Sequence, residues 1–116
     1  MKTHKGSCHC GVVTYEVTAE FVEGMTCNCS RCKRLGAIWS YVDVSAFTLI
    51  KGKEYLTEYH FNKNHIDHLF CNLCGIESYA YGHDGNGNYM YAVNLNCLED
   101  FDTKSLSIQA IDGANL

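Results

Sequence analysis

The spacing of the eight cysteines is the feature that most constrains what this 116-residue chain can fold into. Seven of them fall into three short groups, which are Cys8 and Cys10, then Cys27, Cys29 and Cys32, and finally Cys71 and Cys74. Three thiols within six residues are too close together for ordinary disulfide geometry to use them all. Such a cluster can instead hold one soft metal ion. The spacing therefore predicts metal sites rather than a disulfide framework.

The first and third groups together supply four thiols, the number of ligands in a closed structural zinc site. A glycine follows each group directly, Gly11 after Cys10 and Gly75 after Cys74, and glycine permits the tight turns that a metal knuckle needs. The two pairs lie far apart in the sequence, so a shared ion would close a long loop and restrict the unfolded chain. The alternative is that the pairs are buried free thiols that share no ion.

The middle group supplies three thiols, so a bound zinc would keep a fourth position for water or a substrate thiol. An open position distinguishes catalytic zinc from structural zinc, and a thiol on zinc is a deprotonated nucleophile at neutral pH. We therefore predict Cys27, Cys29 and Cys32 as catalytic residues and as ligands of a second zinc. A redox-sensing cluster and a closed site completed by a histidine stay open as alternatives. The candidate histidines are His9, His60, His65, His68 and His83.

Cys97 stands apart from all three groups. A free cysteine is often buried as a small hydrophobic side chain, and we expect this role for Cys97 within the sheet. The functional alternative is a reactive thiol on a late strand.

Charge and hydropathy narrow the classes of partner. A net charge of -4 argues against nucleic acid, because duplex binding depends on neutralising phosphates with Lys and Arg. The chain has no apolar run of membrane-spanning length and no apolar leader after its first residues, which argues against a membrane or secreted location. We therefore expect a cytoplasmic protein whose thiols are kept reduced.

Alternating apolar and polar positions predict a mainly β chain that forms a single domain over residues 1–116. Eight Tyr, five Phe and many β-branched residues favour sheet. The expected strands are 12–18, 37–42, 47–50, 55–61, 66–70, 77–81, 89–95 and 106–111. Short turns at even spacing between these segments predict antiparallel pairing.

The remaining segments are expected to turn or to form short helices. A short helix is predicted within 27–34 and is ended by Gly36, and residues 96–101 are expected to form a single helical turn. Residues 4–10 are interpreted as a leading segment with a tight turn, and 20–26 as a connection. The residues with the strongest turn signals are 62–64 and 83–88.

The three cysteine motifs together resemble the glutathione-dependent formaldehyde-activating enzymes and their relatives around centromere protein V. The matching segments are Gly6-Ser7-Cys8-His9-Cys10-Gly11, Cys27-Asn28-Cys29-Ser30-Arg31-Cys32-Lys33-Arg34 with Gly36, and Phe70-Cys71-Asn72-Leu73-Cys74-Gly75. The resemblance extends to Asp112 and Gly113 near the end of the chain. It implies a β-tent fold, in which zinc staples antiparallel sheets together. The sequence departs from the family pattern at Ile76 and Glu77, where many relatives carry a small hydroxylic residue.

The resemblance also implies a division of labour between two zinc ions. Cys8, Cys10, Cys71 and Cys74 would hold the structural ion, and Cys27, Cys29 and Cys32 the catalytic one. The activity named for the family is the condensation of glutathione with formaldehyde to S-hydroxymethylglutathione, which is a carbon–sulfur lyase reaction. It implies that the glutathione thiolate takes the open zinc position and attacks the aldehyde carbon. From charge and proximity, we hypothesise that Lys33 and Arg34 receive the glutathione carboxylates.

Two other functions are compatible with parts of the sequence. A redox enzyme similar to the B-type methionine sulfoxide reductases would use Cys97 as its nucleophile, but those enzymes hold zinc with two Cys-x-x-Cys pairs, whereas the first pair here is Cys-x-Cys. A non-enzymatic zinc module would bind a protein partner through its aromatic-rich strands. A fourth protein ligand beside Cys27, Cys29 and Cys32 would favour that module, because a closed site cannot accept a substrate.

Overall fold

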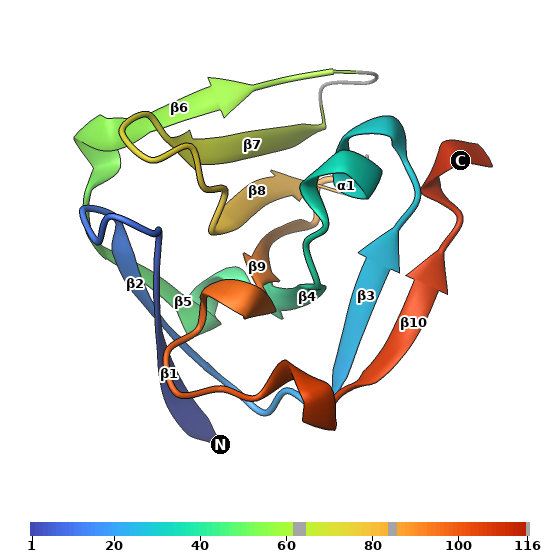
Figure 1. Cartoon of the computed structure of the whole chain (residues 1–116), viewed down its shortest axis with the longest axis horizontal. Coiled ribbons are helices and arrows are strands. Elements are labelled where there is room, and N and C mark those ends of the chain that lie inside the picture. The colour runs from blue at the N-terminus through green and yellow to red at the C-terminus, as the bar shows by residue number, and fades with distance from the viewer. Residues whose placement is uncertain (62–64, 84–85, 116) are drawn as a thin grey trace.

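Two β-sheets form the framework of the computed structural model, which describes residues 1–61, 65–83 and 86–115. The smaller sheet has the strand order β1-β2-β5, and the larger has the order β10-β3-β4-β9-β8-β7-β6 (Figure 1). The strands are β1 Lys2–Ser7, β2 Thr14–Ala19, β3 Glu23–Cys27, β4 Trp39–Asp43, β5 Phe47–Lys51, β6 Leu56–Tyr59, β7 Ile66–Cys71, β8 Tyr79–His83, β9 Tyr89–Asn94 and β10 Ser107–Ile111. The predicted fold class, mainly β with antiparallel sheets and cysteine clusters that could hold zinc, is confirmed.

Helical structure is confined to short pieces. The α-helix α1 spans Ser30–Leu35, and the 3₁₀ turns are η1 Val44–Ala46, η2 Lys53–Tyr55, η3 Leu95–Cys97, η4 Thr103–Ser105 and η5 Gly113–Asn115. Among the described residues, none of the helices is long and apolar enough to cross a membrane. The predicted helix starts later than its motif, at Ser30, because Cys27 completes strand β3.

The structure corrects two of the sequence expectations near the N-terminus. The leading segment 4–10 contains most of strand β1, which pairs antiparallel with β2 from Lys2↔Ala19 to Ser7↔Thr14. The connection expected over 20–26 contains strand β3. Both strands carry few apolar side chains, so the alternation that signals a strand is weak in them. Their backbone hydrogen bonds come from partner strands instead.

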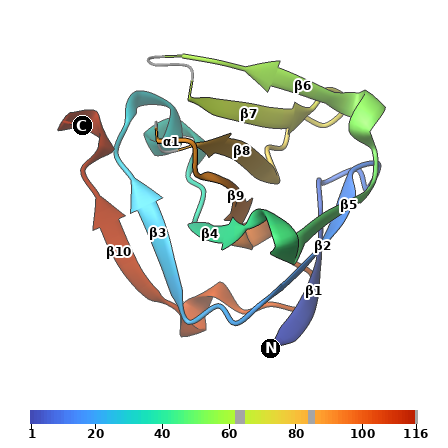
Figure 2. The same ribbon diagram turned by 180° about the vertical axis from the view of Figure 1, so that it is seen from behind.

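The edge formed by β3 and β10 is the exception to antiparallel pairing. These two strands run parallel, from Ser107↔Glu23 to Ile111↔Cys27, and both views of the molecule show them side by side (Figures 1 and 2). A parallel pair cannot be joined by a tight turn, and most of the chain lies between these two strands. The C-terminal residues are thereby brought next to the segment that carries the middle cysteine group.

Smaller differences concern the ends of the predicted elements. The strand expected at 77–81 begins at Tyr79, and the helical turn expected over 96–101 is the 3₁₀ turn η3 at Leu95–Cys97. The loop expected at 83–88 overlaps the end of β8 at His83. The turn predicted at 62–64, and positions 84 and 85 of that loop, lie outside the described residues.

The core lies between the two sheets and is rich in aromatic rings. Tyr15 of β2 stacks on Phe47 of β5 with ring centroids 4.9 Å apart, and Phe47 stacks on Tyr91 of β9 at 4.1 Å. The buried Tyr15 hydroxyl donates a hydrogen bond of 3.1 Å to the backbone oxygen of Ser78. A side chain at Gly6 would collide with the Tyr15 ring. This packing holds β1 and β2 against the region of Ser78. It thereby brings the Cys8–Cys10 pair close to the Cys71–Cys74 pair.

Candidate metal centres

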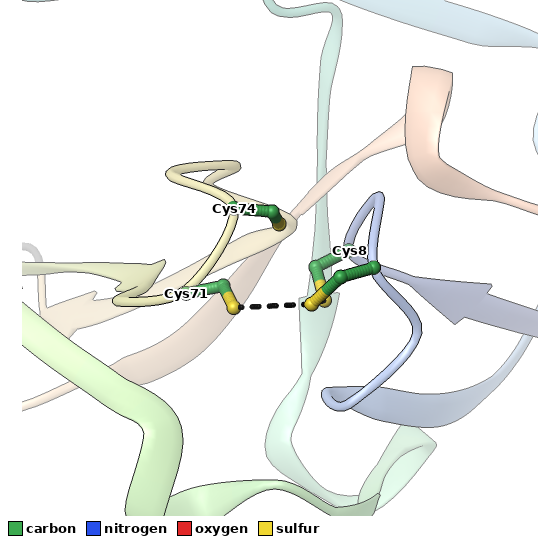
Figure 3. A group of neighbouring side chains, drawn as sticks. Cys8, Cys71 and Cys74 are labelled. Carbon is green, nitrogen blue, oxygen red and sulfur yellow. Dashed lines mark hydrogen bonds between the residues drawn. The ribbon is translucent and has the colours of Figure 1, made fainter.

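Four cysteine sulfurs form one compact cluster, two of them from the turn after β1 and two from the turn at the end of β7. The Sγ atoms of Cys8, Cys10, Cys71 and Cys74 all lie within 4.8 Å of one another. The Cys8–Cys10 and Cys10–Cys71 sulfur distances are both 3.7 Å, and Figure 3 shows Cys71 and Cys74 facing Cys8. A disulfide needs about 2.05 Å, whereas zinc with arms of about 2.3 Å has sulfur–sulfur edges of about 3.8 Å in a tetrahedron. The four thiols therefore fit a tetrahedral zinc ion.

The two turns that supply these thiols have the same design. Gly11 and Gly75 have φ angles of 84° and 82°, which glycine adopts without steric cost. The Gly11 N–H donates to the Cys8 carbonyl at 3.3 Å, and the Gly75 N–H donates to the Cys71 carbonyl at 2.8 Å. The Val13 N–H donates to the Cys8 sulfur at 3.4 Å. These bonds fix the turns as knuckles that direct their sulfurs to a common point.

Electrostatics in the four-cysteine cluster favours a cation. Burial opposes ionisation of Cys74, but the N–H groups of Ile76 and Cys10 and the thiols of Cys71 and Cys8 lower the pKa of Cys74 to about 6. The Val12 N–H favours the Cys10 thiolate, yet burial and the neighbouring thiols raise the pKa of Cys10 to about 11. Cys74 therefore ionises readily, and a negative charge on one thiol disfavours ionisation of the neighbouring thiols. Four thiolates together would need a bound cation.

The middle group forms a second cluster at the junction of β3 and α1. Cys27 ends β3, Cys29 caps the N-terminus of α1, and Cys32 lies in its first turn. Their sulfurs also lie within 4.8 Å of one another. The Cys29 N–H donates to the Cys27 sulfur at 3.4 Å, and the Cys32 N–H donates to the Cys29 sulfur at 3.3 Å. The three soft donors of this turn fit one face of a tetrahedral zinc ion.

The pKa values of this cluster diverge. Burial opposes ionisation of Cys29, but the Cys32 N–H and the neighbouring thiols lower the pKa of the Cys29 thiol. Burial, together with the charges and hydrogen bonds of Cys29 and Cys27, raises the pKa of Cys32 to about 12. The cluster therefore carries one ionised thiol most readily, and further ionisation calls for a bound cation.

No fourth donor from the described part of the chain joins these three cysteines. The compact donor group contains Cys27, Cys29 and Cys32, without a histidine or carboxylate within the same 4.8 Å spread. His9 is exposed beside the other cluster, and His60 pairs with Asp67 at 2.6 Å. The histidine-closed site is therefore not what the described residues form, and these residues would supply a bound metal with three ligands.

A cavity of about 470 Å³ opens beside the three-cysteine cluster. Its size is typical of small-molecule sites. Its walls are mostly aromatic and apolar, with histidines among them, and the residues that line it are Met25, Cys27, Cys29, Cys32, Trp39, Tyr41, Phe61, His65, Ile66, His68, Ala80, Tyr81, Gly82, His83, Met90, Ala92, Ile111 and Gly113. The four-cysteine cluster contributes none of its sulfurs to this described lining. The three-cysteine cluster therefore faces this ligand-sized space, and the sulfurs of the other cluster lie outside its described lining.

The C-terminal turn clamps the three-cysteine loop from one side. The Asn28 N–H donates to the Ile111 carbonyl at 3.2 Å. The Asn28 side chain donates to Asp112 Oδ1 at 2.9 Å and accepts from the Ala114 N–H at 2.9 Å. A Cβ at Gly113 would collide with the Cys27 sulfur and would lie 3.4 Å from the Cys29 Cβ. Sequence reasoning missed this clamp, although the terminal Asp112-Gly113 pair was part of the resemblance.

A buried ion pair holds the same loop from the other side. Arg31, between Cys29 and Cys32, places its Nη2 atom 2.6 Å from Oε1 of Glu77, whose side chain is fully buried. The second carboxylate oxygen lies 3.4 Å from Nδ1 of His68. The Arg31 guanidinium also lies over the Tyr59 ring, 4.8 Å from its centroid. Glu77 therefore links the three-cysteine loop to the segment after the Cys71–Cys74 knuckle.

The two basic residues predicted to bind carboxylates are exposed on α1. Arg34 donates to the Ser30 carbonyl at 2.8 Å, and it lines a second hollow of about 400 Å³ together with Arg31 and Phe61. Phe61 also lines the cavity beside the cysteines. Neither Lys33 nor Arg34 is among the described residues that line that cavity.

Cys97 lies in the 3₁₀ turn η3, half-buried, rather than on a strand. Burial, followed by the charges of Cys8, Cys74 and Glu77, raises the pKa of Cys97 to about 11. A reactive cysteine needs a lowered pKa. This environment therefore argues against the reductase-like role, in which Cys97 is the nucleophile.

Comparisons with known proteins agree with this arrangement. Residues 3–110 match the family model described as glutathione-dependent formaldehyde-activating enzyme. The fold is similar to the crystal structure of a Rhodobacter sphaeroides protein from the Northeast Structural Genomics programme, with a TM-score of 0.81 and 34% sequence identity. That alignment covers 92% of this chain and 99% of the other.

Proposed function

Because the chain belongs to the glutathione-dependent formaldehyde-activating enzyme family, we propose that it adds a thiol, most directly glutathione, to formaldehyde or a similar small electrophile. The observation that carries this proposal is the pairing of a three-thiol cluster with a ligand-sized cavity. Cys27, Cys29 and Cys32 would hold a zinc ion there, and Cys8, Cys10, Cys71 and Cys74 would hold a structural one. A zinc ion with an open position supplies two effects, thiol deprotonation and carbonyl polarisation.

The chain's own residues supply the shape in which the addition takes place. The aromatic and apolar walls of the cavity, among them Trp39 and Tyr81, exclude bulk water from the reacting atoms. Asn28 and Arg31 hold the cysteine loop from two sides. The loop can therefore present its three sulfurs in one orientation before a ligand binds, which lowers the ordering cost of the reaction.

The reaction needs no oxidant or reductant. A carbon–sulfur bond forms between the thiol and the aldehyde carbon, the carbonyl π bond opens, and the oxygen takes up the proton that the thiol loses. The product is a hydroxymethyl thioether.

The charged ends of glutathione would be received outside the cavity. We place its carboxylates near Lys33 and Arg34, and Arg34 has the better position because it lines the hollow that shares Phe61 with the cavity. A planar guanidinium also matches a carboxylate better than a lysine ammonium does.

The experiment is a rate measurement, since thiols add to formaldehyde without a catalyst. Two-dimensional exchange NMR on an equilibrium mixture of glutathione, formaldehyde and adduct measures the interconversion rate with and without protein loaded with zinc. We expect acceleration by the wild type and by Cys97→Ser, but not by Cys29→Ser. A zinc-loaded wild type that leaves the rate unchanged would overturn the proposal.

A further inference from the structure

One histidine of the cavity differs from the others in its surroundings. His68 on β7 is buried, with 6% of its surface exposed, and it lines the same cavity as Cys27, Cys29 and Cys32. Its ring stacks on Phe61 with centroids 5.1 Å apart. The cysteines and His68 therefore border one cavity, where a substrate can touch both.

The orientation of the His68 ring is set by a carboxylate. Nδ1 lies 3.4 Å from Oε2 of Glu77, and an ionised carboxylate only accepts hydrogen bonds. The Nδ1 atom of a neutral ring must then carry the proton, so Nε2 keeps a lone pair. Nε2 is on the edge of the ring opposite Glu77, and the described residues give it no hydrogen-bond partner.

Arg31 balances the charge of this pair. Its guanidinium lies 2.6 Å from the other oxygen of Glu77, whose side chain has no exposed surface. A buried carboxylate without a partner would be costly, so Arg31 allows Glu77 to remain a charged acceptor for His68. The three residues form one chain of contacts from the cysteine loop to the cavity wall.

Resting on the proposed function, we propose that Nε2 of His68 transfers the proton during thiol addition, with Glu77 as the residue that positions it. When the thiol binds and is deprotonated, Nε2 receives its proton. As the thiolate sulfur then bonds to the aldehyde carbon and the carbonyl π bond opens, Nε2 delivers that proton to the aldehyde oxygen, and the imidazole returns to its neutral form. The same proton leaves sulfur and reaches oxygen, so atoms and charges balance.

The other titratable groups of the cavity are arranged differently. His65 and His83 are half-buried and pack against each other, with ring centroids 4.6 Å apart. Tyr41 and Tyr81 also line the cavity. His68 combines burial with a carboxylate that orients its ring.

The decisive kinetic test uses His68→Gln and His68→Ala, with His60→Ala, an exposed histidine that is not part of the described cavity lining, as the control. We expect kcat of the two His68 variants to fall by about 10²-fold or more, as is usual for a lost proton-transfer group, with zinc content unchanged. Added imidazole should restore turnover in His68→Ala in proportion to its concentration, and should not stimulate His60→Ala. Full turnover in zinc-loaded His68→Gln would overturn the proposal, whereas a wild type without activity would first remove the proposed function itself.

A spectroscopic test of Glu77 does not depend on activity. In Glu77→Gln, the amide oxygen would accept from Arg31 and the amide nitrogen would face His68, so Nδ1 must accept and Nε2 takes the proton. We expect the ¹⁵N shifts of the His68 ring to show a protonated Nδ1 in the wild type and a protonated Nε2 in Glu77→Gln. An Nε2-protonated wild-type ring would refute the positioning role.

Discussion

The two cysteine clusters are built from different local structures and differ in their access to the cavity. The four-cysteine cluster draws on two knuckles from distant parts of the chain, and its Cys8 and Cys71 side chains are buried, whereas Cys10 is exposed. The three-cysteine cluster comes from one short segment, and each of its thiols is half-buried beside the cavity. Under the proposed function, donor number and access to the cavity, rather than the type of residue, would separate the structural site from the catalytic one.

The clusters also differ in what holds them in place. The knuckles adjoin strands whose side chains belong to the core, such as Tyr15 and Val17 of β2. Helix α1 has no buried residue, and its loop is held by the polar contacts of Asn28 and Arg31. We therefore expect the fold to depend on metal binding by the four-cysteine cluster more than on metal binding by the three-cysteine cluster.

The largest effect is expected from breaking the closed cluster. Cys71→Ser removes a fully buried ligand, and structural zinc contributes an apparent binding free energy of about 10–16 kcal/mol to folding. We expect this variant to lose both zinc ions and its cooperative thermal transition, as measured by circular dichroism and elemental analysis. Cys29→Ser is the counterpart from the open cluster, and it should keep one zinc and a cooperative transition. Equal damage by the two substitutions would contradict the division.

A middle-sized effect is expected from the C-terminal clamp. Gly113→Ala places a methyl group against the Cys27 sulfur, so the sulfur must move out of its position among the three thiols. We expect the zinc affinity of the open cluster to fall by about 10–100-fold, the range seen when residues that support metal ligands are changed. Competition with a chromophoric chelator measures it.

The matched control for this clamp is Ala114→Gly, which alters the same turn without adding an atom next to Cys27. It should retain the wild-type affinity. If Gly113→Ala binds both zinc ions as the wild type does, the turn is not packed against the ligand as described.

The smallest effect is expected at the exposed basic residues. Exposed ion pairs contribute about 0.2–1 kcal/mol each, so Lys33→Ala combined with Arg34→Ala should weaken glutathione binding by about 2–30-fold. Isothermal titration with glutathione measures the loss, and Lys104→Ala, an exposed lysine on η4, serves as the control. Unchanged binding by the double variant would remove both residues from the glutathione site.

The cysteine pattern carried much of this account before the structure. Two glycine-flanked pairs far apart in the sequence predicted the four-thiol cluster, and the compact middle motif predicted the three-thiol one. The sulfurs of each group lie close together as expected. Each motif is short, so its own residue spacing already limits where its sulfurs can lie. Strand β3 was missed, since its parallel partner β10 is near the other end of the chain.

The surroundings of each site could not be predicted from the sequence, because they too are formed by residues that are distant in the sequence. Five of the six histidines were candidates, and only the fold shows that His68 meets a buried Glu77. Glu77 was noticed as a departure from the family pattern, but its contact with Arg31 depends on where α1 docks. Such contacts depend on the tertiary fold, and no local sequence pattern around either residue indicates its partner.

The central claim is that one cluster is closed and the other is open to a thiol. The most direct test is the zinc content per chain of anaerobically purified protein, followed by chelator challenge with and without glutathione. We expect two zinc ions, with one resistant to chelator throughout and the other protected only when glutathione is present. A single zinc ion, or a second ion that glutathione does not protect, would contradict this claim.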